Sequence, residues 1–95
     1  MMIKLEHVAG EDRGKIVVYA LSTCAWCKRL KKTLNELKVA YDFVDVDQLK
    51  GADEKEAEKE VKHWNAKETY PTMILNNEKV FLGLDLEEIK QALGK

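Results

Sequence analysis

Two cysteines separated by two residues are the feature of this sequence most suited to covalent chemistry. Cys24 and Cys27 are the only cysteines in the chain, and they open a segment with helical periodicity. At positions i and i+3 of a helix, two thiols lie side by side. A helix N-terminus carries roughly half a positive charge and unpaired N–H groups, and both favour a thiolate. We therefore predict that Cys24 is the attacking thiolate of a thiol–disulfide exchange and that the more buried Cys27 resolves the mixed disulfide.

Other uses of the same cysteines stay open at this point. A C-x-x-C pair can be half of a zinc site, but the only histidines that could complete it are His7 and His63, which lack finger-like spacing. A metal or iron–sulfur carrier is therefore the alternative function, and a pair of inert core cysteines is the third reading. A disulfide staple is disfavoured, because so short a loop removes little entropy from the unfolded chain.

The residues around the cysteines predict alternating strands and helices. Residues 15–21 are apolar and rich in β-branched side chains, as in a strand buried on both faces. A helix should follow to about Lys38, with Cys27 on its apolar stripe together with Leu30, Leu34 and Leu37. Further strands are expected over 2–8, 40–46, 72–75 and 79–82, and further helices over 51–66 and from residue 85 onward.

These elements predict one α/β domain over residues 1–95 with a mixed four-stranded sheet flanked by helices. The first β–α–β unit makes its strands parallel, and a tight Asn76-Asn77 turn makes the last two strands antiparallel. The 15–21 strand then has a neighbour on each side. Residues 1–14, a strand and a turn, form an N-terminal extension whose strand is expected at an edge of the sheet.

Composition excludes several classes of partner. The net charge of −1 and the pI of about 6.1 do not suggest nucleic-acid binding. The longest purely apolar run, residues 16–21, is far shorter than the roughly 20 residues that span a bilayer. The N-terminus does not resemble a secretory signal. We expect a cytoplasmic monomer without nucleic-acid or membrane partners.

Two further positions stand out without any comparison. Pro71 is the only proline and opens a predicted strand, a place where strands tolerate proline. On the base rate for X-Pro bonds alone, its peptide bond would be trans. Asp85 and Glu88 have the spacing of a helix capping box.

Three motifs in order resemble the glutaredoxin family, and the resemblance extends from about residue 15 to residue 93. They are Ser22-Thr23-Cys24-Ala25-Trp26-Cys27-Lys28, Thr69-Tyr70-Pro71 and Phe81-Leu82-Gly83-Leu84-Asp85. The resemblance implies a thioredoxin fold with its four strands in the order 2-1-3-4. It implies reduction of protein or small-molecule disulfides without a bound cofactor.

The resemblance also implies roles for individual residues. The Tyr70–Pro71 bond should be cis and face the cysteines, and the Tyr70 backbone should hold the bound peptide or glutathione. Thr69 and Asp85 would complete the substrate-binding residues, although Asp85 has a competing role as a helix cap.

Departures from the family pattern concern the electron donor. Leu21, Glu68 and Leu84 stand where many members have lysine, arginine and glycine for glutathione. Weak use of glutathione is therefore predicted, with another small thiol or a thioredoxin-reductase-type flavoprotein as the better donor. Gly-Leu-Asp in place of Gly-Gly-Asp is similar to microbial glutaredoxin-like proteins. The lack of proline at Ala25-Trp26 is similar to members that bridge a [2Fe–2S] cluster between two chains.

Overall fold

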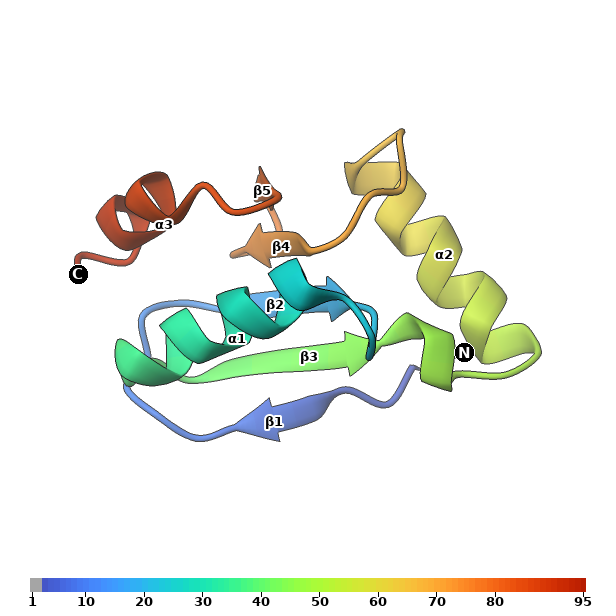
Figure 1. The fold of residues 1–95 in the computed structure, drawn as a ribbon, viewed down its shortest axis with the longest axis horizontal. Helices are drawn as coiled ribbons and strands as arrows, with labels where there is room; N and C mark the ends of the chain where they lie inside the picture. The colour runs from blue at the N-terminus through green and yellow to red at the C-terminus, as the bar shows by residue number, and fades with distance from the viewer. Residues whose placement is uncertain (1–2) are drawn as a thin grey trace.

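In the computed structural model, which describes residues 3–95, the chain forms a five-stranded mixed sheet with helices on both faces (Figure 1). No helix within these residues has the length and apolar character needed to cross a membrane. In chain order the elements are β1 (Glu6–Val8), β2 (Ile16–Ala20), α1 (Ala25–Glu36), β3 (Tyr41–Asp45), a 3₁₀ turn (Val46–Gln48), α2 (Ala52–Trp64), β4 (Thr72–Leu75), β5 (Lys79–Leu82) and α3 (Leu86–Ala92).

The strand order of the sheet is β1-β3-β2-β4-β5. β2 pairs parallel with β3 and antiparallel with β4, and β4 pairs antiparallel with β5. The four strands of the predicted sheet thus take the predicted order and directions, with β2 in the middle. The extension strand β1 lies at the edge beside β3, antiparallel to it, which confirms the expected edge position and identifies its partner.

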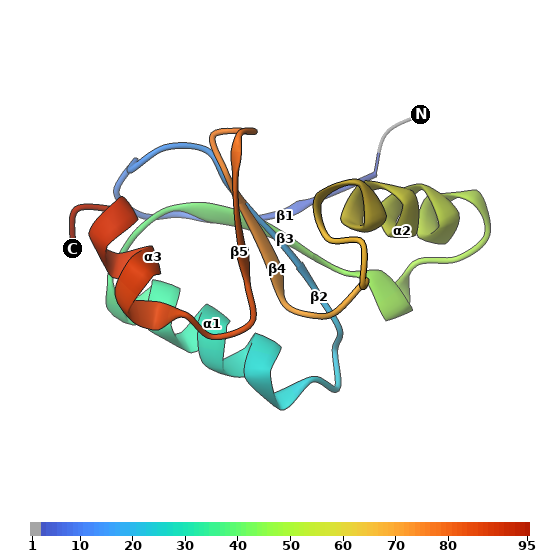
Figure 2. The same ribbon diagram turned by 90° about the horizontal axis from the view of Figure 1, so that it is seen from above.

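Two cores lie on opposite faces of the sheet, and every residue of β2 is buried because its side chains alternate between them. Viewed from above, α1 and α3 cover one face and α2 covers the other (Figure 2). Cys27, Leu30 and Leu34 of α1 join Ile89 of α3 in the first core. Ala57 and Val61 of α2 join alternate residues of β2 in the second. The helix that carries the cysteines is therefore fixed by its apolar stripe, as the periodicity predicts.

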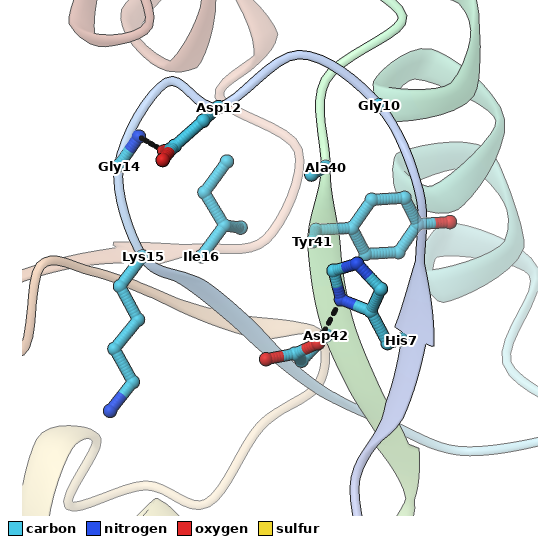
Figure 3. A pocket seen from close by; sticks show the side chains of 9 residues that line it. All are labelled: His7, Gly10, Asp12, Gly14, Lys15, Ile16, Ala40, Tyr41 and Asp42. Atoms are coloured by element: carbon cyan, nitrogen blue, oxygen red, sulfur yellow. Dashed lines mark hydrogen bonds and ion pairs between the residues drawn. The ribbon is translucent and has the colours of Figure 1, made fainter.

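The connection from β1 to β2 closes the end of the sheet opposite the cysteines. It passes so close to the residues just before β3 that a Cβ at Gly10 would lie 2.5 Å from the carbonyl carbon of Val39. Close backbone approach is a place where only glycine fits. The neighbouring strand pair is joined by His7, whose Nδ1 donates to Asp42 Oδ1 at 2.7 Å across a shallow hollow (Figure 3).

Element ends differ from the predicted ranges by a few residues. Of the predicted 2–8 strand, residue 2 lies outside the described residues, and pairing starts only at Glu6, while Ile3 and Leu5 pack on the α2-side core. The α1 helix stops at Glu36, because Lys38 turns into the left-handed region with φ 59°. The turn residues Asn76 and Asn77 have φ of 54° and 55°, as the dipeptide predicts.

Candidate active site at the start of α1

Cys24 is the N-cap residue of α1. Its backbone is extended, with φ −84° and ψ 116°, and its Sγ accepts a hydrogen bond from the Cys27 N–H at 3.1 Å. The first turn of α1 contains no acidic residue, so no side-chain charge offsets the positive end of the helix there. Backbone donors and the helix dipole both stabilise an anion at this position. The Cys24 sulfur therefore lies at the positive end of the helix, where it accepts a hydrogen bond from a backbone N–H group.

Cys27 lies one turn further in and has a different environment. It is fully buried, with 0% of its surface exposed, in the core formed by α1, α3 and the sheet. Burial raises the pKa of the Cys27 thiol to about 12, and the hydrogen bond and charge of Cys24 act in the same direction. Both cysteines are free thiols in this structure. The structure thus has the predicted difference in burial, with a partly exposed Cys24 and a fully buried Cys27.

The loop between β2 and Cys24 is held by the 3₁₀ turn that follows β3. The Ser22 N–H and hydroxyl donate to the two oxygens of Asp47, at 2.8 and 2.5 Å, and Gln48 Nε2 donates to the Ser22 hydroxyl at 3.1 Å. These donors lower the pKa of the Asp47 carboxyl. The N–H of Cys24 itself donates to the Leu21 carbonyl at 3.2 Å. The helix start is thus tied to the residues that follow β3.

The Tyr70–Pro71 peptide bond is cis, as the family resemblance implies. Pro71 is buried and immediately precedes β4, whose first residue, Thr72, pairs with Tyr19 near the end of β2. The half-buried Tyr70 packs on the same core as Cys24. Burial, followed by the nearby glutamate charges, raises the pKa of the Tyr70 phenol, and a negative charge on Cys27 would add to the effect. The structure therefore packs Tyr70 and Cys24 against the same core, with Cys27 near enough for its charge to act on Tyr70.

Asn65, a residue without a signal in the sequence analysis, holds the loop that leads to Tyr70. Its buried side chain donates through Nδ2 to the carbonyl and hydroxyl of Thr69, at 3.1 and 2.9 Å, and to the Thr72 hydroxyl at 3.2 Å. Its Oδ1 accepts from the Lys67 N–H at 3.2 Å. The Thr69 carbonyl also accepts from Thr72 at 2.8 Å. The spacing Asn-x₃-Thr-x₂-Thr after a helix is the pattern that could have indicated this network.

Asp85 takes the capping role that competed with substrate binding. Its Oδ1 accepts from the Glu88 N–H at 3.4 Å at the start of α3. The Asp85 carboxylate, by its hydrogen bond and its charge, raises the pKa of the Glu88 carboxyl. The residue before it, Leu84, packs on the core and lines a hollow with Trp26.

The candidate zinc ligands are placed apart from the cysteines. His7 is paired with Asp42 on the β1–β3 edge, and the ring of His63 meets Trp64 edge-on at 5.3 Å in α2. Among residues 3–95, no three His, Cys, Asp or Glu side chains gather in a way that could hold a metal ion. The histidines therefore do not complete a tetrahedral site with Cys24 and Cys27.

Comparisons with known proteins agree with this geometry. The glutaredoxin family model matches residues 16–80. The crystal structure of a glutaredoxin from Methanosarcina mazei Go1 is 47% identical, covers 96% of this chain and 88% of its own, and superposes with a TM-score of 0.89. Methanoredoxin from Methanosarcina acetivorans is 46% identical over 90% of each chain, with a TM-score of 0.88.

A curated relative gives the same family at lower similarity. Glutaredoxin 1 of Rickettsia conorii is 34% identical over 62 residues, which span 65% of this chain and 58% of the relative. The matched region of the family model contains both cysteines, the cis proline and the three central strands. The chain belongs to the glutaredoxin family, and its fold is the thioredoxin fold of that family with one added edge strand.

Proposed function

We propose that this chain is a thiol–disulfide oxidoreductase that reduces disulfides in proteins or small molecules by dithiol exchange. One observation carries the proposal. The Cys24 sulfur caps the helix and accepts a hydrogen bond from the Cys27 backbone N–H at 3.1 Å, while the Cys27 thiol is fully buried one turn further in. Membership of the glutaredoxin family supports the same reaction class.

The reaction needs only these two side chains and an incoming disulfide. The Cys24 thiolate attacks one sulfur of the substrate disulfide, a mixed disulfide forms, and the other substrate sulfur leaves as a thiolate. Cys27 then loses its proton, which the departing substrate thiolate accepts, and attacks Cys24 Sγ. The substrate leaves with one thiol and one thiolate, which takes a proton from water, and the protein is left with a Cys24–Cys27 disulfide that an external two-electron donor must reduce.

The loop before β4 supplies the position at which a substrate can be held. Tyr70 packs against the same core as Cys24, and its loop is fixed by Asn65 through Thr69 and Thr72. An extended segment of the substrate can pair with the Tyr70 backbone as a short added strand, which aligns its disulfide with Cys24. Thr69 contributes by shaping this loop, since its side-chain oxygen and carbonyl are engaged within it.

The electron donor is proposed to be a small thiol other than glutathione or a thioredoxin-reductase-type flavoprotein. Glu68 is negatively charged and cannot form an ion pair with a carboxylate of glutathione, as an arginine would. Leu21 and Leu84 are apolar and partly buried. The proposed reaction needs Cys24 and Cys27 in their reduced form, and the cytoplasm is a compartment that keeps thiols reduced. The protein would act there as a monomer on disulfide-containing proteins.

The test offers oxidised protein each donor separately and measures the rate of reduction by the appearance of free thiols. Reduction by glutathione should be slow, and another small thiol or a flavoprotein reductase should be faster. Saturable reduction by low millimolar glutathione, faster than by every alternative, would contradict the donor assignment. The metal content and visible spectrum of anaerobically purified protein test the iron–sulfur or zinc carrier alternative, which a stoichiometric metal would establish in place of the reductase.

A further inference from the structure

A groove lies along α1 on the side that faces α3, and it begins next to the active site. Two adjoining hollows make up this groove, and they share Arg29 and Lys32. The one nearer Cys24 is lined by Ala25, Trp26, Lys28, Arg29, Lys32 and Leu84. The one further along α1 is lined by the two shared residues and by Thr33, Glu36, Leu37, Leu86 and Lys90.

The groove combines an apolar surface with an unpaired cationic rim. Within residues 3–95, none of Lys28, Arg29 and Lys32 forms an ion pair, and all three are exposed. By contrast Lys31, on another face of the same helix, is bound to Asp45 at 2.9 Å. Glu36 is the acidic side chain among the groove residues. A cationic strip of this kind attracts an anionic partner and steers its approach.

Trp26 provides an anchor point at the active-site end of the groove. Its side chain is 58% exposed, although it stands between the two cysteines in the sequence. A Cβ at Gly83 would lie 3.7 Å from its ring, so the ring rests over the backbone before α3. Exposed tryptophans of this kind are typical binding hot spots, and burial of this ring would bring a partner directly to Cys24.

We infer that the α1–α3 groove docks an acidic segment of the proteins whose disulfides this chain reduces, with Trp26 and Leu84 contacting an apolar side chain next to the substrate cysteine. This inference rests on the proposed reductase function and specifies its substrate class. The twelve residues of α1 span about 18 Å, so about six extended residues of the partner cover the groove.

The test uses disulfide peptides in which one cysteine, joined to a small neutral thiol, has a six-residue flank containing four acidic residues. The flank stands before the cysteine in one peptide and after it in another, and matched peptides carry glutamine and asparagine instead. At low salt, we expect wild-type protein to reduce one of the acidic peptides with a kcat/KM at least about tenfold above its neutral match, and high salt to remove the difference.

Charge reversal distinguishes the groove from the net charge of the protein. Arg29→Glu combined with Lys32→Glu should abolish the preference for the acidic peptide. Lys55→Glu combined with Lys59→Glu changes the net charge equally, at two exposed positions on α2, and should retain the preference. Equal kcat/KM for acidic and neutral peptides in the wild type would overturn the inference, as would loss of the preference in both double variants.

A binding experiment keeps the inference testable apart from catalysis. In a Trp64→Phe background the fluorescence of Trp26 can be titrated with an acidic peptide that lacks cysteine. Saturable change with the acidic peptide, and none with the neutral one, is expected. If no disulfide peptide were reduced while this binding persisted, the reductase function would fail and the groove would stand. If the neutral peptide were reduced and the acidic peptide did not bind preferentially, the reductase function would stand and the groove inference would fail.

Discussion

The clearest quantitative consequence of the active-site geometry is a large difference in the reactivity of the two thiols. The perturbation is alkylation of the fully reduced protein at about pH 8. The pKa of Cys27 is raised from 9.0 to about 12, and each pH unit changes the thiolate fraction tenfold. Compared with a thiol of pKa 9.0, ionisation alone therefore slows alkylation of Cys27 about a thousandfold. Complete burial of Cys27 slows the reaction further. Cys24, by contrast, is partly exposed, so an alkylating reagent can reach its sulfur.

The assay is timed reaction with iodoacetamide under anaerobic conditions, followed by peptide mapping of the label by mass spectrometry. Cys24 should be labelled to completion before measurable labelling of Cys27, and the two rates should converge when the protein is unfolded in urea. The convergence is the control, because it shows that the fold and not the local sequence causes the difference. If Cys27 in the folded protein reacted first, or within tenfold of Cys24, the assignment of attacking and resolving thiols would be wrong.

Three further predictions use the same structure. Cys24→Ser should abolish all reduction, whereas Cys27→Ser should abolish dithiol reduction of proteins but trap a mixed disulfide at Cys24 that is visible by mass; a Cys27→Ser variant with full protein reduction would contradict the mechanism. Asn65→Ala removes several buried hydrogen bonds and should lower the free energy of unfolding by about 2–4 kcal/mol, measured by urea titration, with slower reduction of peptides; an unchanged stability would remove Asn65 from the positioning of the loop. Because the native pKa of Cys27 is raised, the thiol form stabilises the reduced fold fully below about pH 9, and this contribution is lost as the pH rises toward 12; reduced Cys27→Ala should therefore lose less stability than the wild type between those values, and equal losses would count against the raised pKa.

Much of the fold could be predicted because local signals and topology rules agree. The apolar stripe of α1 places Cys27 inside, and the Asn76-Asn77 turn sets the direction of β5. The edge position of β1 followed from exclusion, because β2 already has two neighbours. Its pairing with β3 could not be predicted, since that contact depends on the close approach of Gly10 to Val39, which only the folded backbone reveals.

The active site divides in the same way. The cysteines were predicted from spacing and helix position, and the cis bond at Pro71 from the family resemblance, because proline by itself favours trans. Asn65 was missed, since a polar residue after a helix usually indicates only a helix end. The groove beside Trp26 was also missed, because it requires α3 to lie next to α1, and that contact joins residues far apart in the chain.

The added strand β1 changes how this sheet can meet other chains. An unpaired edge strand presents a row of N–H and C=O groups that can template aggregation or domain swapping. β1 covers that row along β3 over the register Glu6↔Phe43 to Val8↔Tyr41. The new edge is only three residues long and carries the exposed, polar Glu6 and His7, two features by which natural sheets resist further pairing. A chain shortened to begin at Gly10 would uncover the β3 edge, and self-association through that strand is the consequence to be expected from its loss.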